Sequence, residues 1–210
     1  MKTLIVTGVH QAEAEFGERV IEKYKELYGV PNSVKIFAVP ENKGSNHEDA
    51  EKESAAYAQV IPVIKEHSPA LLIDIHNGFK TLNAGEPYYI TLFYDGLNHV
   101  STHQEFDALY ALLLEKRIHA EGCGVLPEHE LIRKMGAKCI GIETKLTAFA
   151  DWSKQDKLSG QALHNFLAAS AKKNNMHYDK AIEHTAQVAH FLHTEFPERF
   201  PRLFQSTVQH

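Results

Sequence analysis

A histidine and a glutamate lie three residues apart near the start of the chain, directly after the apolar segment 3–9. Neutral imidazole and carboxylate groups are both common zinc ligands, so His10 and Glu13 could bind a metal ion. In a chain with 14 histidines such a pair is expected roughly once by chance, so its position decides its meaning. Gly8 precedes the pair and permits a sharp turn of the backbone. The segment therefore predicts a binding loop at the end of a first strand.

Two more side chains of the same kind close apolar segments later in the chain. His76 ends the segment LLIDIH, and Glu143 ends the segment CIGIE. A carboxylate at the end of a buried strand is costly unless it is paired, bound to a metal or exposed in a cleft. Because parallel strands bring their carboxyl ends to one edge of a sheet, distant residues can meet there. The sequence therefore predicts one site built from His10, Glu13, His76 and Glu143.

Two imidazoles and one carboxylate form the ligand set of a catalytic zinc ion, which leaves a coordination position for water. Zinc lowers the pKa of its bound water to about 7, and a neighbouring carboxylate can accept the proton and pass it to a leaving amine. Glu143 is the candidate for that role. This combination predicts the hydrolysis of an amide or an ester bond.

Simpler interpretations stay open for each of these residues. His10 and Glu13 could be a surface histidine and a carboxylate that favours the first turn of a helix. His76 could be a hydrogen-bonded histidine at a strand end, and Glu143 could form a structural ion pair with Lys145 or Arg133. Strand alternation places Asp74 on the same face as His76, where it could orient that ring or bind a loop backbone.

The pattern resembles the zinc carboxypeptidase superfamily, including its aspartoacylase and succinylglutamate desuccinylase branch. His-x-x-Glu after the first strand, Asp-x-His at a later strand end and a glutamate on a subsequent strand carry the resemblance, which covers roughly residues 1–150. It implies that zinc binds through His10, Glu13 and His76, with Glu143 as general base. It also implies a three-layer α/β fold in which a mostly parallel or mixed sheet lies between helices.

One feature of that family is missing from this chain. Family members usually carry an arginine between the second and third ligands, but no arginine occurs here between Arg19 and Arg117. Asn42 and Lys43 occupy a comparable loop, although a lysine cannot reproduce the bidentate grip of a guanidinium group. Lys43, Asn42 and Arg133 are therefore the candidates for contact with the substrate or the oxyanion.

The expected activity is the zinc-dependent cleavage of an amide bond in a short peptide or a small acylated amino acid. One alternative is an N-acyl amino acid deacylase of the aspartoacylase or desuccinylase type. A second alternative, from another class, is a metal-binding or interaction module that no longer turns over. Retention of Glu143 disfavours this module, because a structural zinc site usually fills its fourth position with a protein ligand.

Short apolar segments that alternate with helical patterns predict an α/β domain with a mostly parallel sheet, here a single domain over residues 1–210. After about residue 158 the pattern is helical, to about 196, and Pro197 and Pro201 are expected to end regular structure. The loops expected to follow strands are 40–51 and 77–87. The predicted strands are 3–9, 33–39, 70–75, 88–94 and 138–143, and the predicted helices are 14–28, 48–66, 103–119, 159–172 and 179–195.

The composition of the chain limits the classes of binding partner and the cellular compartment that we expect. The formal charge is −5 and no basic cluster with interleaved aromatic residues occurs, which argues against nucleic acid. No apolar run is long enough to span a membrane, and the apolar start is interpreted as a strand and not as a signal peptide. Cys123 and Cys139 lie far apart, which fits a reducing cytoplasm. His184, His190 and His193 are expected at the surface, and the oligomeric state stays open.

Overall fold

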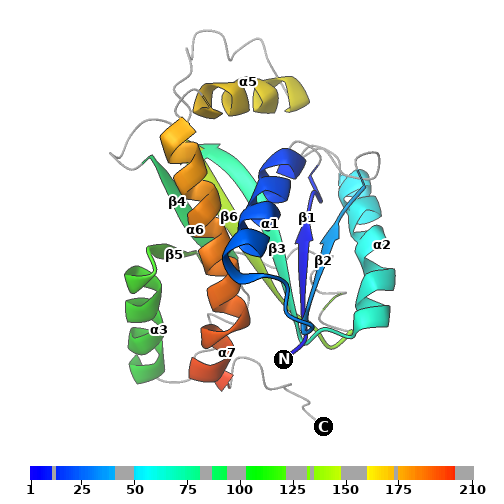
Figure 1. Ribbon diagram of the computed structural model, residues 1–210, viewed down its shortest axis with the longest axis vertical. Helices are drawn as coiled ribbons and strands as arrows, with labels where there is room; N and C mark the ends of the chain where they lie inside the picture. The colour runs from blue at the N-terminus through cyan, green and yellow to red at the C-terminus, as the bar shows by residue number, and fades with distance from the viewer. Residues whose placement is uncertain are drawn as a thin grey trace.

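A computed structural model describes residues 1–10, 13–40, 50–80, 87–93, 103–121, 132, 135–147, 160–172 and 175–201. These residues form an α/β fold around a six-stranded mixed, mostly parallel sheet (Figure 1). The strands are β1 (Thr3–Thr7), β2 (Val34–Ala38), β3 (Leu71–Lys80), β4 (Tyr88–Phe93), β5 (Ile118–Glu121) and β6 (Lys138–Thr147). The helices are α1 (Ala14–Tyr28), α2 (Ala50–His67), α3 (His103–Glu115), α5 (Gly160–Lys172), α6 (Asn175–His193) and α7 (Glu195–Arg199).

The strand order is β2-β1-β3-β6-β4-β5, and β4 pairs with β6 antiparallel and with β5 parallel, so β4 and β5 run opposite to the other four strands. The carboxyl ends of β1, β3 and β6 therefore lie at the same edge of the sheet as the amino end of β4. This confirms the predicted fold class. It also makes the edge beyond β1 and β3 the place where His10 and His76 can meet.

Strand alternation divides the core into two layers. Ile5 and Ile73 point toward α1, α3, α6 and α7, whereas Leu4, Val6 and Leu72 point toward α2. Helices thus cover both faces of the sheet, as the predicted sandwich requires (Figure 1).

Helix α1 has the bounds that its periodicity predicts, 14–28. Phe16, Val20 and Tyr24 recur at helical spacing and are buried against the sheet. Gly17 lets the helix approach β1 closely, because a Cβ atom there would lie 2.8 Å from the Cβ of Thr7. The helix ends at Gly29, which has a positive φ of 68° and donates its N–H to the carbonyl of Lys25.

The structure corrects three predicted elements. The helix expected over 103–119 ends at Glu115, because Arg117 adopts a positive φ of 55° and the chain enters the unpredicted strand β5. Residues 77–80 continue β3 and do not begin a loop, because they pair with β6. Pro197 lies inside α7, within the first turn, where its missing N–H costs no helical hydrogen bond.

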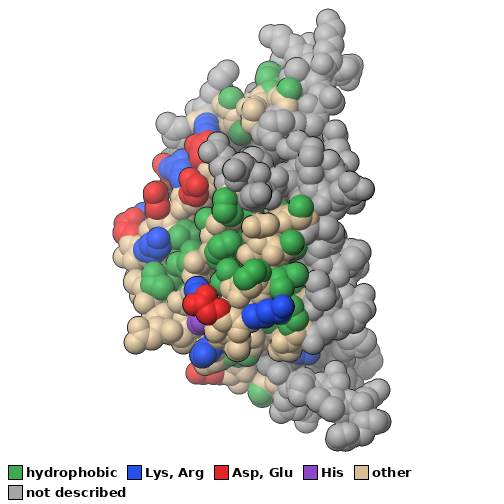
Figure 2. Space-filling view, turned by 90° about the vertical axis from the view of Figure 1, so that its right-hand side faces the viewer, with side chains coloured by type: hydrophobic (Ala, Val, Ile, Leu, Met, Phe, Trp, Pro, Cys, Tyr) green, Lys and Arg blue, Asp and Glu red, His purple; other side chains and the backbone are tan. Residues whose placement is uncertain are grey.

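Strand β2 forms one edge of the sheet. Lys35 on this strand forms an ion pair with Glu66 near the end of α2, at an Nζ–Oε2 distance of 2.7 Å. Viewed from this side of the molecule, hydrophobic side chains lie among acidic and basic ones (Figure 2). A lysine on an edge strand discourages pairing with another chain.

None of the helices in the described part of the chain is long and apolar enough to cross a bilayer.

Candidate metal centre

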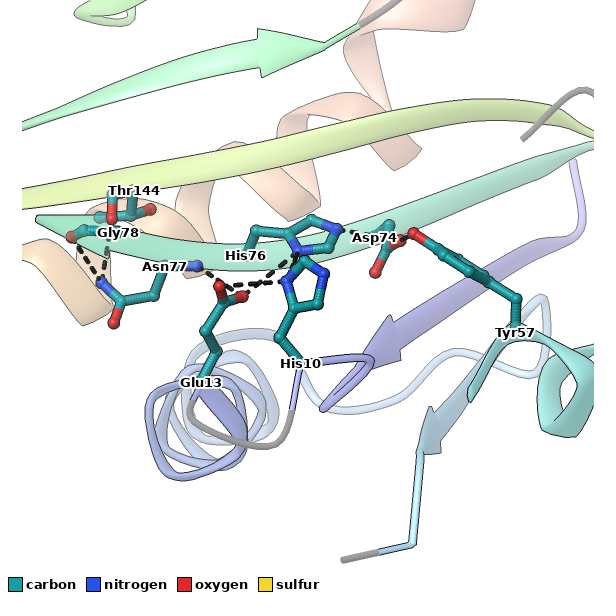
Figure 3. A network of polar contacts seen from close by, with 8 residues as sticks. All are labelled: His10, Glu13, Tyr57, Asp74, His76, Asn77, Gly78 and Thr144. Atoms are coloured by element: carbon teal, nitrogen blue, oxygen red, sulfur yellow. Dashed lines mark hydrogen bonds and ion pairs between the residues drawn. The ribbon is translucent and has the colours of Figure 1, made fainter. Parts of the chain in front are cut away.

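The turn after β1 brings His10 and Glu13 together. Gly8 has a positive φ of 75°, and its hydrogen-only side chain lies against the backbone of Val39, where a Cβ atom would be 3.3 Å from the carbonyl oxygen. The N–H of Glu13 then donates to the carbonyl of His10 at 3.0 Å. Both side chains are buried and point toward His76 and Asn77 in the middle of β3 (Figure 3).

The register of β1 and β3 places His76 beside this turn. Thr7 pairs with Ile75, so His76 is the next residue of β3 beyond the last residue of β1. The preceding residues Leu71–Ile75 are all buried in the middle of the sheet, which fixes the position of His76 within β3. His10, Glu13 and His76, which the sequence predicts to converge, do so.

Two imidazole nitrogens and both oxygens of one carboxylate face one another at this point (Figure 3). The Nδ1 atom of His10 lies 3.2 Å from Oε1 of Glu13, and the Nδ1 atom of His76 lies 3.3 Å from Oε2. The two Nδ1 atoms are 3.3 Å apart. One ligand atom from each residue lies within 4.8 Å of the others, so the three side chains could hold a metal ion.

This donor set fits a divalent ion such as zinc. Tetrahedral zinc with nitrogen and oxygen ligands at about 2.0–2.1 Å separates neighbouring ligand atoms by about 3.3–3.4 Å. The distance of 3.3 Å between the two Nδ1 atoms matches that spacing, and each Nδ1 atom lies 3.2 to 3.3 Å from a different oxygen of Glu13. The ligand set identifies a divalent metal ion and not one particular element, because several divalent ions accept imidazole and carboxylate ligands.

A buried carboxylate orients His76 from its other side. The Nε2 atom of His76 lies 3.0 Å from Oδ2 of Asp74, which also accepts a hydrogen bond of 2.5 Å from the hydroxyl of Tyr57. Asp74 thus keeps a proton on Nε2 and leaves Nδ1 directed at His10 and Glu13. Of the two roles open to Asp74 from the sequence, orientation of the histidine is the one that this contact supports.

The same carboxylates control the protonation of His76. Burial disfavours the charged imidazolium, but the charges and hydrogen bonds of Asp74 and then Glu13 outweigh it and raise the pKa of His76 well above 6.5. In the metal-free protein this raised pKa favours the protonated form of His76. A metal ion at this position replaces that proton as the positive partner of the two carboxylates.

The backbone of β3 holds Glu13 in place. The N–H of Asn77 donates to Oε2 of Glu13 at 3.0 Å, and the side-chain amide of Asn77 donates to the carbonyl of Thr144 at 3.0 Å (Figure 3). Asn77 thus connects the carboxylate of Glu13 to the neighbouring strand β6. Sequence reasoning missed this residue, although it directly follows His76.

Glu143 lies next to the three converging residues, on the adjacent strand. It pairs directly with His76 in the parallel register of β3 and β6, so both side chains lie on the same face of the sheet. Gly78 makes room for its carboxylate, because a Cβ atom at that position would collide with Oε1 of Glu143. Glu143 is half-buried, which leaves it open to a substrate.

The alternative of an ion pair between Glu143 and Lys145 is not what the structure shows. Lys145 lies two residues further along β6, and its Nζ atom lies 5.7 Å from the ring centroid of Tyr89. Within the described residues, Lys145 forms no ion pair with Glu143. Arg133, the other candidate partner, lies outside the described residues, as do the predicted substrate contacts Asn42 and Lys43.

The three histidines of α6 are not simple surface residues, contrary to expectation. His184 bonds through Nε2 to the carbonyl of Lys116, and His193 bonds through Nδ1 to the hydroxyl of Thr3, both at 2.8 Å. The ring of His190 stacks on Tyr28 with a centroid separation of 3.7 Å. All three tie α6 to neighbouring elements and lie outside the group of residues around His76.

No protein-family model matches this chain, and no curated protein matches it in sequence. Among solved structures, a metallo-carboxypeptidase from Burkholderia cenocepacia matches with 14% identity and a TM-score of 0.44, over 90% of this chain and 56% of that one. This chain therefore spans little more than half of that carboxypeptidase. An N-acetylmuramoyl-L-alanine amidase from Clostridium difficile 630 matches with 11% identity and a TM-score of 0.44, over 92% and 98% of the chains.

A solved structure with a different description matches as well. A Helicobacter pylori MTAN mutant with 5'-methylthioadenosine in its active site matches with 10% identity and a TM-score of 0.45, over 94% of this chain and 98% of that one. These likenesses are distant and concern the fold alone. The function of this chain has to be inferred from its own residues.

Proposed function

We propose that this protein is a zinc-dependent hydrolase that cleaves an amide bond of a short peptide or a small acylated amino acid. The observation that carries the proposal is the convergence of His10, Glu13 and His76, whose ligand atoms lie within 4.8 Å of one another beside Glu143. A buried group of two histidines and one carboxylate supports metal binding, because these side chains bind divalent ions strongly.

Each residue has a distinct part in this proposal. His10, Glu13 and His76 would hold the zinc ion, and Asp74 keeps the Nδ1 lone pair of His76 directed at it. When bound, zinc activates water and polarises a carbonyl group. Glu143 accepts a proton from the attacking water and delivers it to the leaving amine. Its half-buried position next to His76 supports this role.

The proposal is tested with purified full-length protein and a Glu143→Gln variant. Metal analysis should give about one zinc ion per chain for both proteins, because Glu143 is not among the three ligands. Hydrolysis by the variant should fall by about 10²-fold or more, since it has lost its general base. Undiminished hydrolysis with zinc still bound would remove Glu143 from the mechanism, and absence of zinc from both proteins would refute the metal site.

The substrate panel decides between the peptidase and the deacylase. It contains short peptides with free carboxyl ends, the same peptides as amides, and N-acyl amino acids with acyl chains of different length. Cleavage confined to N-acyl amino acids identifies a deacylase. Binding of zinc without cleavage of any member would favour the metal-binding module over an enzyme.

A further inference from the structure

A cavity of about 430 Å³ lies at the opposite end of the sheet from β2, between β4, the start of β5 and α6. The described residues that line it include Tyr88 and Tyr89 of β4, Arg117 and His119, and His177 and Lys180 of α6. The cavity lies apart from His10, Glu13 and His76, none of which lines it.

The turn at Arg117 opens this cavity. Strand β5 pairs with β4 from Ile118 opposite Ile90 onward, so Tyr88 and Tyr89 extend beyond the start of β5. Arg117 precedes the strand in a left-handed conformation, with a φ of 55°, which costs energy for a residue with a side chain. Pairing between β4 and β5 therefore begins at Ile90, one residue after Tyr89, and Arg117 is among the residues that line the cavity.

Arg117, Lys180 and His177 bring side-chain nitrogen atoms to this cavity. Arg117 and Lys180 are exposed, and neither forms an ion pair with another described residue. No carboxylate belongs to the described residues that line the cavity. The Nδ1 atom of His177 is buried and has no hydrogen-bond partner within the described part of the chain. Such a group of donors is complementary to the oxygen atoms of an anion.

The tyrosines give the cavity an apolar side. The ring of Tyr89 packs edge-on against His119 at a centroid distance of 5.6 Å, and Tyr88 packs in the same manner against His184 at 5.8 Å. Aromatic walls beside cationic ends suit an organic molecule that carries its charge at one end.

We propose that this cavity is a binding site for a small organic anion, whose carboxylate or phosphate group is held by Arg117 and Lys180 and whose apolar part lies against Tyr88 and Tyr89. The site goes beyond the proposed hydrolase activity and does not depend on a bound metal.

The bound anion can be part of the hydrolysed substrate or a separate molecule. The register of the sheet shows how far the cavity lies from Glu143 and His76. Glu143 pairs with both His76 and Thr91, and Thr91 pairs with His119, so these four residues form one row across β3, β6, β4 and β5. At about 4.8 Å per strand, the row spans roughly 15 Å. The anion is therefore either the distal end of a long acidic substrate or a separate small molecule.

The test is calorimetric titration of the full-length protein with inorganic phosphate and, separately, with the dicarboxylate glutarate. We expect saturable binding of at least one of them. Arg117→Gln and Lys180→Gln should each weaken it by about tenfold, because each removes a charge-assisted hydrogen bond. Lys35→Gln is the matched control, since it removes the same charge at the other edge of the sheet, and should leave binding unchanged.

Failure of both anions to bind saturably would overturn the site, and so would equal weakening by Lys35→Gln. A double variant lacking Arg117 and Lys180 that still binds like the unaltered protein would also overturn it. Competition between the bound anion and a hydrolysed substrate assigns the cavity to the substrate, whereas simultaneous binding assigns it to a separate anion. Because these titrations need no turnover, they can fail or succeed independently of the hydrolase proposal.

Discussion

The Nδ1 atoms of His10 and His76 lie 3.3 Å apart, and each faces a different oxygen of Glu13. Two imidazole lone pairs at this distance repel each other unless a proton or a cation lies between them. Asp74 reinforces the arrangement by binding the far side of His76, so the ring cannot turn away without losing that contact. This geometry therefore favours a positive charge, from a proton or a metal ion, between His10, His76 and Glu13.

Replacement of Asp74 should weaken metal binding without abolishing it. In the unaltered protein the negative charge of Asp74 orients His76 and increases the basicity of its ring. Asp74→Asn removes that charge, and such changes lower metal affinity by about 10–100-fold. Competition with a chromogenic chelator measures the affinity. Tyr57→Phe is a milder companion, because it removes one hydrogen bond to Asp74 and keeps the carboxylate. An affinity for Asp74→Asn equal to that of the unaltered protein would contradict the orienting role.

Addition of one methyl group at Gly78 should impair turnover and spare the metal. The new Cβ atom would meet Oε1 of Glu143, so the carboxylate has to leave its position against Gly78. We expect kcat to fall by about tenfold or more while zinc content stays near one per chain. Gly141→Ala is the control, because its Cβ atom would lie 3.4 Å from Phe93, at ordinary contact distance. Equal activity of the two variants would show that the carboxylate has another position available.

Metal binding should release protons near neutral pH. Burial opposes a charge on His76, but Asp74 and Glu13 raise its pKa well above 6.5, and the metal has to displace the proton. Affinity for zinc should therefore increase as the pH rises through that raised pKa. Calorimetry in two buffers of different ionisation enthalpy should count about one released proton per metal ion at neutral pH. A count near zero would mean that His76 is already neutral in the metal-free protein.

The same pKa fixes the sign of the pH effect on stability in the metal-free protein. A histidine whose folded-state pKa is raised stabilises the fold fully below its unfolded value of about 6.5, and this contribution is lost as the pH rises through the folded value. Asp74→Asn should reduce the dependence, because it removes the first of the two carboxylates that raise the pKa. Urea unfolding of metal-free protein across this pH range measures the effect.

A buried hydroxyl pair between β6 and α6 should show strongly non-additive mutations. Thr185 donates to the carbonyl of Ala181 at 2.7 Å, so it accepts the 2.8 Å hydrogen bond from Thr144, and both threonines are fully buried. Thr185→Val leaves the hydroxyl of Thr144 without this acceptor and should lower the free energy of unfolding by about 1–3 kcal/mol. Replacement of both threonines by valine should cost less than the sum of the single changes, as a urea double-mutant cycle would show.

The local pattern of the sequence determined much of the fold and three residues of the candidate site. Helix α1 and strands β1, β2 and β4 follow from hydrophobic periodicity, which depends on residues close together in the chain. His10, Glu13 and His76 were accessible because they lie at or shortly after the ends of apolar segments in the sequence. Parallel pairing then brings strand ends together by a general rule.

Only the tertiary structure decided the surroundings of that site. Tyr57 comes from α2 and reaches Asp74 across the face of the sheet, and no spacing in the sequence reveals that contact. Gly78 accommodates Glu143 only because β3 and β6 pair in one particular register. Strand β5 was hidden because the helix predicted over 103–119 runs through Arg117, where the backbone breaks the helix, and covers the first two residues of the strand. Such features arise from contacts between residues distant in the chain, and short-range periodicity carries no information about them.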